Sequence, residues 1–356
     1  MTDRPALFLV SAAVVAWATL VGPMAQAQVP GAESAGPVVV AQNVETKSSA
    51  ELGIVEWLTR IHGASRKRAY VGTFVVSSGG NLSSARIWHI CDGEQQMVRV
   101  ESLSGAPRST FRRNDQVITF FPQTKTAVSE KRVSLALFPE LFVAADSAIA
   151  QNYFAQRVGS DRVAGLDADI VHLVPKDDLR FGYRVWSEKR TGILLKLQTL
   201  DSDGRTLEQA AFSELQLVAP VNMGKLTKLM DNTEGYRVEY PEIVKTSAAA
   251  EGWVLKSPVN GFKPVACFKR PGSGADGQTP DNRMQWIFTD GLASLSLFVE
   301  PVDRRRHVQE GATSSGATNT LSRRVVDKSG EWWLTLVGEV PRQTLVVFAQ
   351  GLERRK

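Results

Sequence analysis

The stretch GILLKLQTLDSDGRTLEQAAFSELQL, residues 192–217, decides the fold class of this chain. Two runs in which apolar and polar residues alternate flank Asp203 and Gly204, and alternation with a period of two is typical of a half-buried β-strand. An Asp-Gly pair between such runs favours a tight turn, so the stretch predicts an antiparallel hairpin. Similar runs recur from residue 69 onward between turn-forming residues, and we therefore expect a long antiparallel meander.

Several of the predicted strands are apolar on both faces. In YVGTFVV, Tyr70, Phe74 and Val76 lie on one face, whereas Val71 and Val75 lie on the other. An antiparallel sheet with one face in water alternates more cleanly. We therefore expect the sheet to curve around a helix or a cavity, although a closed core without space for a ligand gives the same pattern. The aromatic side chains positioned to line such a cavity are Phe120, Phe121, Phe181, Tyr183 and Trp186.

An amphipathic helix is predicted before the first strand. The apolar residues that recur there at helical spacing are Leu52, Val55, Leu58 and Ile61. Ser49 is the candidate N-cap, and Gly63 lies near the expected end of the helix. A second helical patch is expected within residues 135–153, between the early strands and the later ones.

The regular pattern fades in residues 219–249, which we interpret as a linker between a larger domain, residues 49–218, and a smaller one, residues 250–351. In the smaller domain, QWIFTDGLASLSLFVEP, residues 285–301, predicts a hairpin with its turn at Asp290 and Gly291. Two more strand-like runs are expected in EWWLTLVGEVPRQTLVVFAQGL, which closes the chain. The predicted fold class is α+β, with a large β-rich domain followed by a smaller α+β domain.

Residues 1–27 have the pattern of a secretory signal peptide, with an early Arg, an apolar run and a small-x-small cleavage site at Ala25-Gln26-Ala27. The alternative is an uncleaved membrane anchor, which is disfavoured because the apolar run is short and ends at Gly22-Pro23. Residues 28–48 are rich in small and polar residues and predict a flexible leader. We therefore expect the mature protein to be exported.

The positive charge of the chain is unevenly distributed. The sequence has 42 Lys and Arg against 37 Asp and Glu, a formal net charge of +5, and the last third holds most of the excess. Arg304, Arg305 and Arg306 form one cluster that could contact an acidic partner or anionic lipid headgroups, and a solvated surface is the alternative. Nucleic acid is a poor fit for an exported protein without a recognition motif.

Residue types that serve in catalysis or metal binding do not form a recognisable pattern. The four histidines have no zinc-type spacing with Cys or His, and no nucleophile elbow, phosphate loop or dinucleotide fingerprint occurs. His89 and Cys91 share one face of a predicted strand, but neighbours two apart stand roughly 6 to 7 Å from each other, so we expect a structural pair. Cys91 and Cys267 are expected to be two small buried thiols rather than a disulfide. The hypothesis is a binding protein without a cofactor or metal.

The order of these segments resembles the RseB/MucB family of periplasmic regulators of the envelope-stress sigma factor. The resembling segments of the first domain are YVGTFVV, SARIWHICDGE, VESLSGAPRSTFRRNDQV and the run from Asp161 to Leu217. Those of the second domain are GFKPV, FTDGLASLSLFVEP and WWLTLVGEVPRQTL. The resemblance implies a half-open antiparallel β-barrel with helices in its mouth, similar to the lipoprotein carriers LolA and LolB, plus the smaller α+β domain.

The resemblance also implies a function and its partners. Family members bind the periplasmic domain of a membrane anti-sigma factor, shield it from the site-1 protease, and are released by lipopolysaccharide or lipoprotein acyl chains. Strand parity gives the candidate ligand-binding residues Tyr70, Phe74, Phe120, Trp186 and Leu195, and the candidate partner-binding residues are Arg304, Arg305 and Arg306. The alternative is a periplasmic lipid or lipoprotein carrier, which does not require a second domain. The hairpin at 285–301 is expected to build the second sheet, whose exposed side or edge could dock a partner segment.

Overall fold

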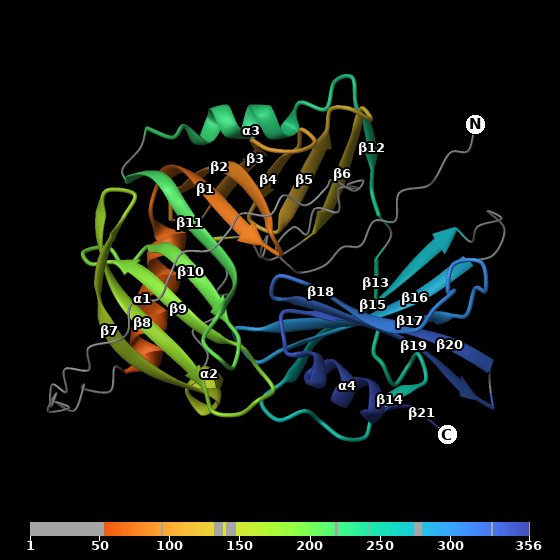
Figure 1. Cartoon of the computed structure of the whole chain (residues 1–356). Helices are drawn as coiled ribbons and strands as arrows, with labels where there is room; N and C mark the ends of the chain where they lie inside the picture. The colour runs from red at the N-terminus through yellow and green to blue at the C-terminus, as the bar shows by residue number, and fades with distance from the viewer. Residues whose placement is uncertain are drawn as a thin grey trace, which may run out of the picture.

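The computed structural model describes residues 53–93, 95–131, 138–139, 147–217, 220–241, 243–273, 280–328 and 330–355. The predicted signal peptide, the leader, the candidate N-cap Ser49 and most of the helical patch at 135–153 lie outside these ranges. In the described part of the chain, no helix is both long enough and apolar enough to cross a membrane. A sheet of 12 strands and a sheet of seven strands form two domains that lie side by side (Figure 1).

The first domain is a half-open barrel built from the 12-stranded sheet. Its strands are β1 (Tyr70–Ser78), β2 (Asn81–Cys91), β3 (Gln96–Ser102), β4 (Ser109–Arg113), β5 (Gln116–Phe121), β6 (Thr126–Lys131), β7 (Tyr153–Val163), β8 (Leu166–Pro175), β9 (Gly182–Glu188), β10 (Leu194–Leu200), β11 (Thr206–Leu217) and β12 (Arg237–Glu239). Strands β1 to β6 and β7 to β11 are two meanders that meet where β11 pairs with β1. Among the described residues the edge strands β7 and β12 do not pair with each other, so the predicted half-open barrel is confirmed.

The hairpin predicted around Asp203 and Gly204 is confirmed. Strands β10 and β11 pair antiparallel, and Gly204 adopts φ +78° in the turn that joins them. The Gly204 backbone N–H donates to the Asp201 carbonyl oxygen at 3.1 Å. A left-handed conformation is far easier for Gly than for other residues, which is why the Asp-Gly signal marks the turn correctly.

Helix α1 (Ile54–Lys67) packs its Leu58 and Ile61 side chains, each 1% exposed, into the core of the first domain. The helix continues through Gly63, which was predicted to lie near its end. Gly costs a helix interior about 1 kcal/mol relative to Ala. Ala64 is buried one position later, and we attribute the continuation to this packing, since tertiary contacts commonly override such a cost.

Part of the predicted linker belongs to the first domain. Within residues 219–249, helix α3 (Met223–Asp231) buries Leu226 and Met230 against a cluster that includes Phe111 of β4 and Phe120 of β5. Strand β12 then pairs parallel with β6. Leu226 and Met230 are four positions apart on one helical face, a signal that the surrounding polar residues obscure in so short a helix.

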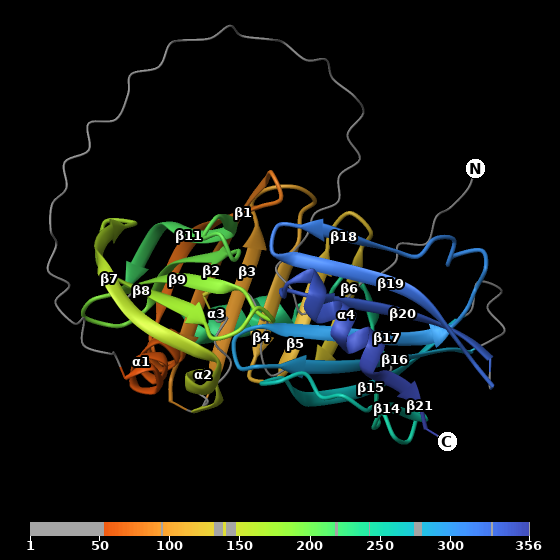
Figure 2. The ribbon, with the colours of Figure 1, turned by 60° about the horizontal axis from the view of Figure 1, so that its bottom comes forward.

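The second domain is built on the seven-stranded sheet with one helix across it (Figure 2). Its elements are β13 (Val244–Lys245), β14 (Trp253–Leu255), β15 (Lys263–Ser273), β16 (Pro280–Thr289), β17 (Ser294–Pro301), β18 (Gly311–Ser315), β19 (Thr318–Asp327), β20 (Gly330–Gly338), α4 (Arg342–Gly351) and β21 (Leu352–Arg354). Strands β14 and β21 form a separate two-stranded sheet. With this smaller domain, the predicted α+β class is confirmed.

The last of the strand-like runs is a helix, so that prediction was wrong. In α4, Leu345, Phe348 and Ala349 are buried at helical spacing, and the Phe348 ring lies 4.8 Å from the ring of Phe288 in β16. The β-branched Val346 and Val347 between them raise strand propensity. Burial of one helical face against the sheet decides the outcome, because short apolar runs are ambiguous between strand and helix.

The hairpin of residues 285–301 forms strands β16 and β17 of this sheet. Leu295, Leu297 and Val299 of β17 share one buried face, at 1%, 0% and 2% exposure, as their alternation predicts. The turn spans residues 290–293 and is longer than a two-residue turn, because Thr289 pairs with Ser294 across it. The hairpin therefore builds the core of the second domain and projects its turn toward the first domain.

Candidate functional site

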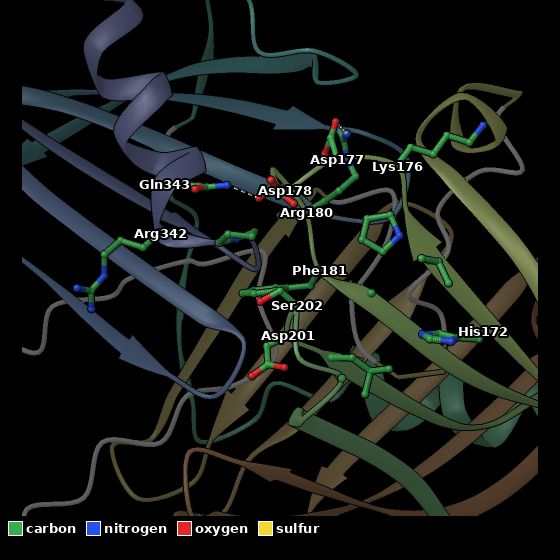
Figure 3. Close-up of a pocket in the computed structure, with 16 residues that line it drawn as sticks. His172, Lys176, Asp177, Asp178, Arg180, Phe181, Asp201, Ser202, Arg342 and Gln343 are labelled. Atoms are coloured by element: carbon green, nitrogen blue, oxygen red, sulfur yellow. Dashed lines mark hydrogen bonds and ion pairs between the residues drawn. The ribbon is translucent and has the colours of Figure 1, made fainter. Parts of the chain in front are cut away.

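A groove of about 690 Å³ lies where the two domains meet (Figure 3). Three separated segments line it: the end of β8 with the loop to β9, the turn between β10 and β11, and the start of α4. The lining residues are His172, Val174, Pro175, Lys176, Asp177, Asp178, Arg180, Phe181, Gly182, Leu200, Asp201, Ser202, Gly204, Pro341, Arg342 and Gln343. Both domains thus contribute walls to one site.

Hydrogen bonds connect the two walls at the start of α4. The Gln343 side chain donates from Nε2 to the Asp178 carbonyl oxygen at 2.6 Å, and the Thr344 hydroxyl donates to the Leu179 carbonyl oxygen at 2.8 Å. Pro341 precedes the helix with φ −52°, and its fixed φ angle suits a helix start. The beginning of α4 is therefore attached to the loop between β8 and β9 of the first domain.

The groove combines apolar and charged side chains. Among its lining residues, Phe181 and Leu200 are buried, whereas Lys176, Asp178 and Arg342 are exposed. Burial, with a smaller effect of the Arg184 charge, lowers the pKa of His172, which favours its neutral form. This mixture can hold an extended peptide through apolar contact, hydrogen bonds and charges of both signs.

Sequence reasoning did not identify this groove. Two of its acidic residues are Asp177, which pairs with Arg180, and Asp178, whose carbonyl oxygen accepts from Gln343 of α4. The lining residues at the start of α4 are more than 100 positions from the other lining segments in the sequence. The only local signal was an acidic pair close to an Arg in a loop, which is common in ordinary turns.

The predicted ligand-binding residues are buried, but they do not share one face of the sheet. From β1 to β5, the residues that lie directly opposite one another across neighbouring strands are Tyr70, His89, Val98, Arg112 and Val117. Directly opposed residues point to the same face, and Phe120 is three positions beyond Val117, so it points to the opposite face from Tyr70. There Phe120 packs in the cluster under α3.

Trp186 also lies on the opposite face from Phe74. Val76, which shares the face of Phe74, lies opposite Ala210, and the successive partners across β10 and β9 are Leu197 and Val185. Val185 is therefore on the same side of the sheet as Phe74. Trp186 is the next residue, and its indole Nε1 donates to Asp161 at 3.2 Å while the Lys196 ammonium lies 4.4 Å from its ring centre. Leu195 is the unpaired residue of a β-bulge and is fully buried.

Aromatic packing fills the face that carries Tyr70 and Phe74. The Phe138 ring lies 5.6 Å from Phe74 and 5.0 Å from Phe212, and Tyr70 stacks on His89 at 4.8 Å. An acyl chain that enters here must displace packed side chains. The ligand-binding role of Tyr70, Phe74, Phe120, Trp186 and Leu195 stays a prediction.

The cluster at Arg304, Arg305 and Arg306 lies in the loop between β17 and β18, outside the groove. Arg306 pairs with Asp303 at 2.8 Å, and the Arg304 guanidinium lies 3.8 Å from the Glu331 carboxylate. Arg305 is exposed. The role of this three-arginine cluster in partner binding also stays a prediction.

His89 contacts groups other than Cys91, and the expectation of a structural pair stays a prediction. The imidazole is buried, with Nδ1 2.6 Å from the Arg68 carbonyl oxygen and Nε2 2.7 Å from the Gln96 side-chain nitrogen. Burial lowers the pKa of His89 to about 4. Both cysteines are free thiols, as expected, but only Cys267 is buried and Cys91 is half-buried. Burial raises the pKa of Cys267 to about 11. No cluster of metal-ligating side chains occurs in the described ranges.

Comparisons with known proteins agree over both domains. The model of the MucB/RseB N-terminal domain matches residues 54–230, and that of the MucB/RseB C-terminal domain matches residues 247–353. The sigma factor AlgU regulatory protein MucB of Pseudomonas aeruginosa is 28% identical over 293 residues, covering 81% of this chain and 87% of that protein. The sigma-E factor regulatory protein RseB of Haemophilus influenzae is 24% identical over 312 residues, covering 86% and 93%. The solved Pseudomonas aeruginosa MucA/MucB complex matches with a TM-score of 0.67 at 26% identity, covering 86% of this chain and 100% of that chain.

Proposed function

The chain belongs to the MucB/RseB family, and on that premise we propose that it binds the periplasmic domain of a membrane anti-sigma factor and so keeps a sigma factor inactive. Its relatives are named sigma factor regulatory proteins, and one solved structure pairs MucB with MucA. The likeness extends over both domains, which supports a function that requires both.

The groove between the domains carries this proposal. Its volume of about 690 Å³ falls within the roughly 300–1,000 Å³ of typical ligand pockets, so it can hold part of an extended peptide. Its walls come from the loop between β8 and β9 and from the start of α4. A segment bound there depends on both domains at once, which a simple carrier domain does not need.

Shielding follows from occupancy of the groove. A protease acts on an accessible, extended segment, and a partner segment held between the two domains is withdrawn from it. We place this activity in the periplasm, where the predicted signal peptide would deliver the protein. The action is binding rather than catalysis, in keeping with a family of regulatory proteins.

The release signal we propose is a lipopolysaccharide or lipoprotein whose acyl chains enter the first domain. The buried face of β1 with Tyr70 and Phe74 offers apolar contacts, and the exposed Arg305 offers a cationic contact for a headgroup or an acidic partner segment. Release requires that the ligand binds the partner-free form more tightly than the partner-bound form.

The test is calorimetric titration of the mature protein with the periplasmic fragment of the host anti-sigma factor, with and without a lipid A-type ligand. We expect tight binding that the ligand weakens. Ser202 is exposed in the groove, so Ser202→Trp should raise the Kd for the fragment about tenfold or more. The control Ser213→Trp alters an exposed position of β11 outside the groove and should leave the Kd unchanged.

Two outcomes would contradict the proposal. Equal fragment affinity for the Ser202→Trp variant and the wild type would remove the groove as the binding site. A protein that binds the lipid ligand but not the fragment would instead be a lipid or lipoprotein carrier.

A further inference from the structure

A buried ion pair joins the two domains. Arg180 lies in the loop between β8 and β9 of the first domain, and Asp290 lies in the turn between β16 and β17 of the second. The Arg180 Nε atom is 2.8 Å from Asp290 Oδ2, and both side chains are 0% exposed. Removing two charges from water is costly, so a pair at this depth survives only with close geometry and further hydrogen bonds.

The Arg180 guanidinium contacts three acceptors that come from both domains. Nη1 donates to the Asp177 carboxylate in its own loop, and Nη2 donates to the Asn260 carbonyl oxygen of the second domain at 2.7 Å. The Phe262 ring centre lies 5.1 Å from the guanidinium carbon. A guanidinium is a planar fork whose donors have fixed directions, so these acceptors can all be reached only in one relative placement of the two domains.

The Asp290 carboxylate is satisfied in the same way. Oδ2 also accepts from the Tyr153 hydroxyl at 3.0 Å, and Oδ1 accepts from the backbone N–H groups of Leu292 and Ala293 at 2.9 and 2.8 Å. The Tyr153 ring belongs to the core of the first domain. Asp290 therefore shapes its own turn and receives two donors from the other domain.

Two glycines show how closely the surfaces fit around this pair. A Cβ atom on Gly261 would lie 2.4 Å from Asn152 Oδ1 and 2.6 Å from Arg180 Nη2. A Cβ atom on Gly291 would lie 2.6 Å from Ile149 Cγ1. Both glycines are in the second domain, and the atoms they approach are in the first. The domains thus meet at distances that leave no space for side chains.

We propose that Arg180 and Asp290 are positioning residues that set the angle between the two domains and thereby hold the two walls of the groove at their spacing. The role in partner binding rests on the function proposed above. Interfaces between domains of one chain commonly permit relative motion. Here a rotation would strand a buried charge without its partner, which opposes motion more strongly than the loss of a solvated contact.

Other contacts between the domains lie around this pair. Gly79 of the first domain and Gly316 of the second approach so closely that a Cβ on Gly79 would be 3.0 Å from the Gly316 nitrogen. Gln343 and Thr344 donate to the loop that carries Arg180. If these contacts set the angle on their own, removing the ion pair would leave the angle unchanged, which makes the proposal testable.

The test is the distance between spin labels in the full mature protein, measured without any partner. Lys228→Cys on α3 and Gln350→Cys on α4 place labels at exposed helical positions of the two domains, in a background with Cys91→Ala and Cys267→Ala. The double variant Arg180→Gln/Asp290→Asn removes both charges, so no buried charge is left unpaired. The matched control is Arg237→Gln/Glu239→Gln, which removes a pair that is 77% and 41% exposed on β12.

We expect the distance distribution of the double variant to broaden and its maximum to shift, and that of the control to match the wild type. Circular dichroism and thermal unfolding verify that each variant is folded. Affinity for the anti-sigma fragment should then fall on the order of tenfold in the double variant only. An unchanged, narrow distribution in a folded double variant overturns the proposal. Absence of fragment binding by the wild type would instead refute the proposed function, while the distance measurement still tests the positioning role.

Discussion

Two Asp-Gly turns in this protein look alike in sequence and differ entirely in their surroundings. Asp203–Gly204 joins β10 to β11, and Asp290–Gly291 lies between β16 and β17. Both glycines have positive φ angles, +78° and +101°. Asp203 pairs with Arg205 in solvent, with side-chain exposures of 60% and 76%, whereas Asp290 pairs with Arg180 at 0% exposure.

The difference shows that a turn signal specifies local geometry and nothing about the partner that the turn meets. At Gly204 a Cβ atom would contact nothing within 4 Å, but at Gly291 it would collide with Ile149. The same dipeptide therefore reverses the chain at an exposed edge of the groove in one domain, while in the other it forms part of the surface that contacts the first domain. Four predictions test the difference between buried and exposed groups, from the largest expected effect to the smallest.

The largest effect is expected from the two arginines that pair with these aspartates. Arg180→Gln should lower the free energy of unfolding by about 3–5 kcal/mol, because it leaves Asp290 buried without its ion pair. Arg205→Gln should change it by no more than about 0.5 kcal/mol, because exposed pairs contribute little. Urea denaturation of both variants measures the difference, and similar small losses would mean that the junction is accessible to water.

The buried His89 side chain should make the stability of the first domain depend on pH. Burial lowers the pKa of His89 to about 4 from its usual 6.5, so the unfolded chain takes up a proton first as the pH falls. Stability from the neutral imidazole is therefore present above pH 6.5 and is lost toward pH 4, by about 3 kcal/mol in total. Unfolding free energies of the wild type and the His89→Gln variant measured across this range should converge as the pH falls. Parallel curves would contradict the assignment to His89.

The glycines of the two turns should respond unequally to a methyl group. Gly204→Ala should cost about 1 kcal/mol, since only the positive φ angle opposes it. Gly291→Ala adds a collision with Ile149 and should cost about 2–4 kcal/mol, because overpacking adds to the backbone strain. Thermal unfolding of the two variants compares them directly. Equal costs would show that the interface adjusts without penalty.

The smallest effect is expected from a single hydroxyl. Tyr153→Phe removes one donor to Asp290, while Arg180 and two backbone N–H groups remain, so stability should fall by about 1 kcal/mol. The control Tyr240→Phe alters a residue that is 75% exposed and should have no measurable effect. A loss as large as that of Arg180→Gln would identify the hydroxyl as the main contact of the junction.

The β-rich first domain, its Asp203–Gly204 hairpin and the buried face of β17 were all predictable, because each rests on contacts between sequence neighbours or on a period of two. The strand predicted over α4 was wrong, because Val346 and Val347 favour a strand until one helical face is buried on the sheet. The linker prediction missed α3 for a similar reason: only its packing against β4 and β5 shows that Leu226 and Met230 form a face.

The sequence by itself determined the fold class, the two-domain order and the family. These features depend on local periodicity and on the order of segments, which can both be observed in the linear sequence. Only the tertiary structure decided which groups meet. Arg180 and Asp290 are 110 positions apart, and nothing in either loop indicates that they share a buried site. Such contacts depend on how the two domains pack, because the free energy of a buried charge is set by neighbours that come from distant parts of the chain.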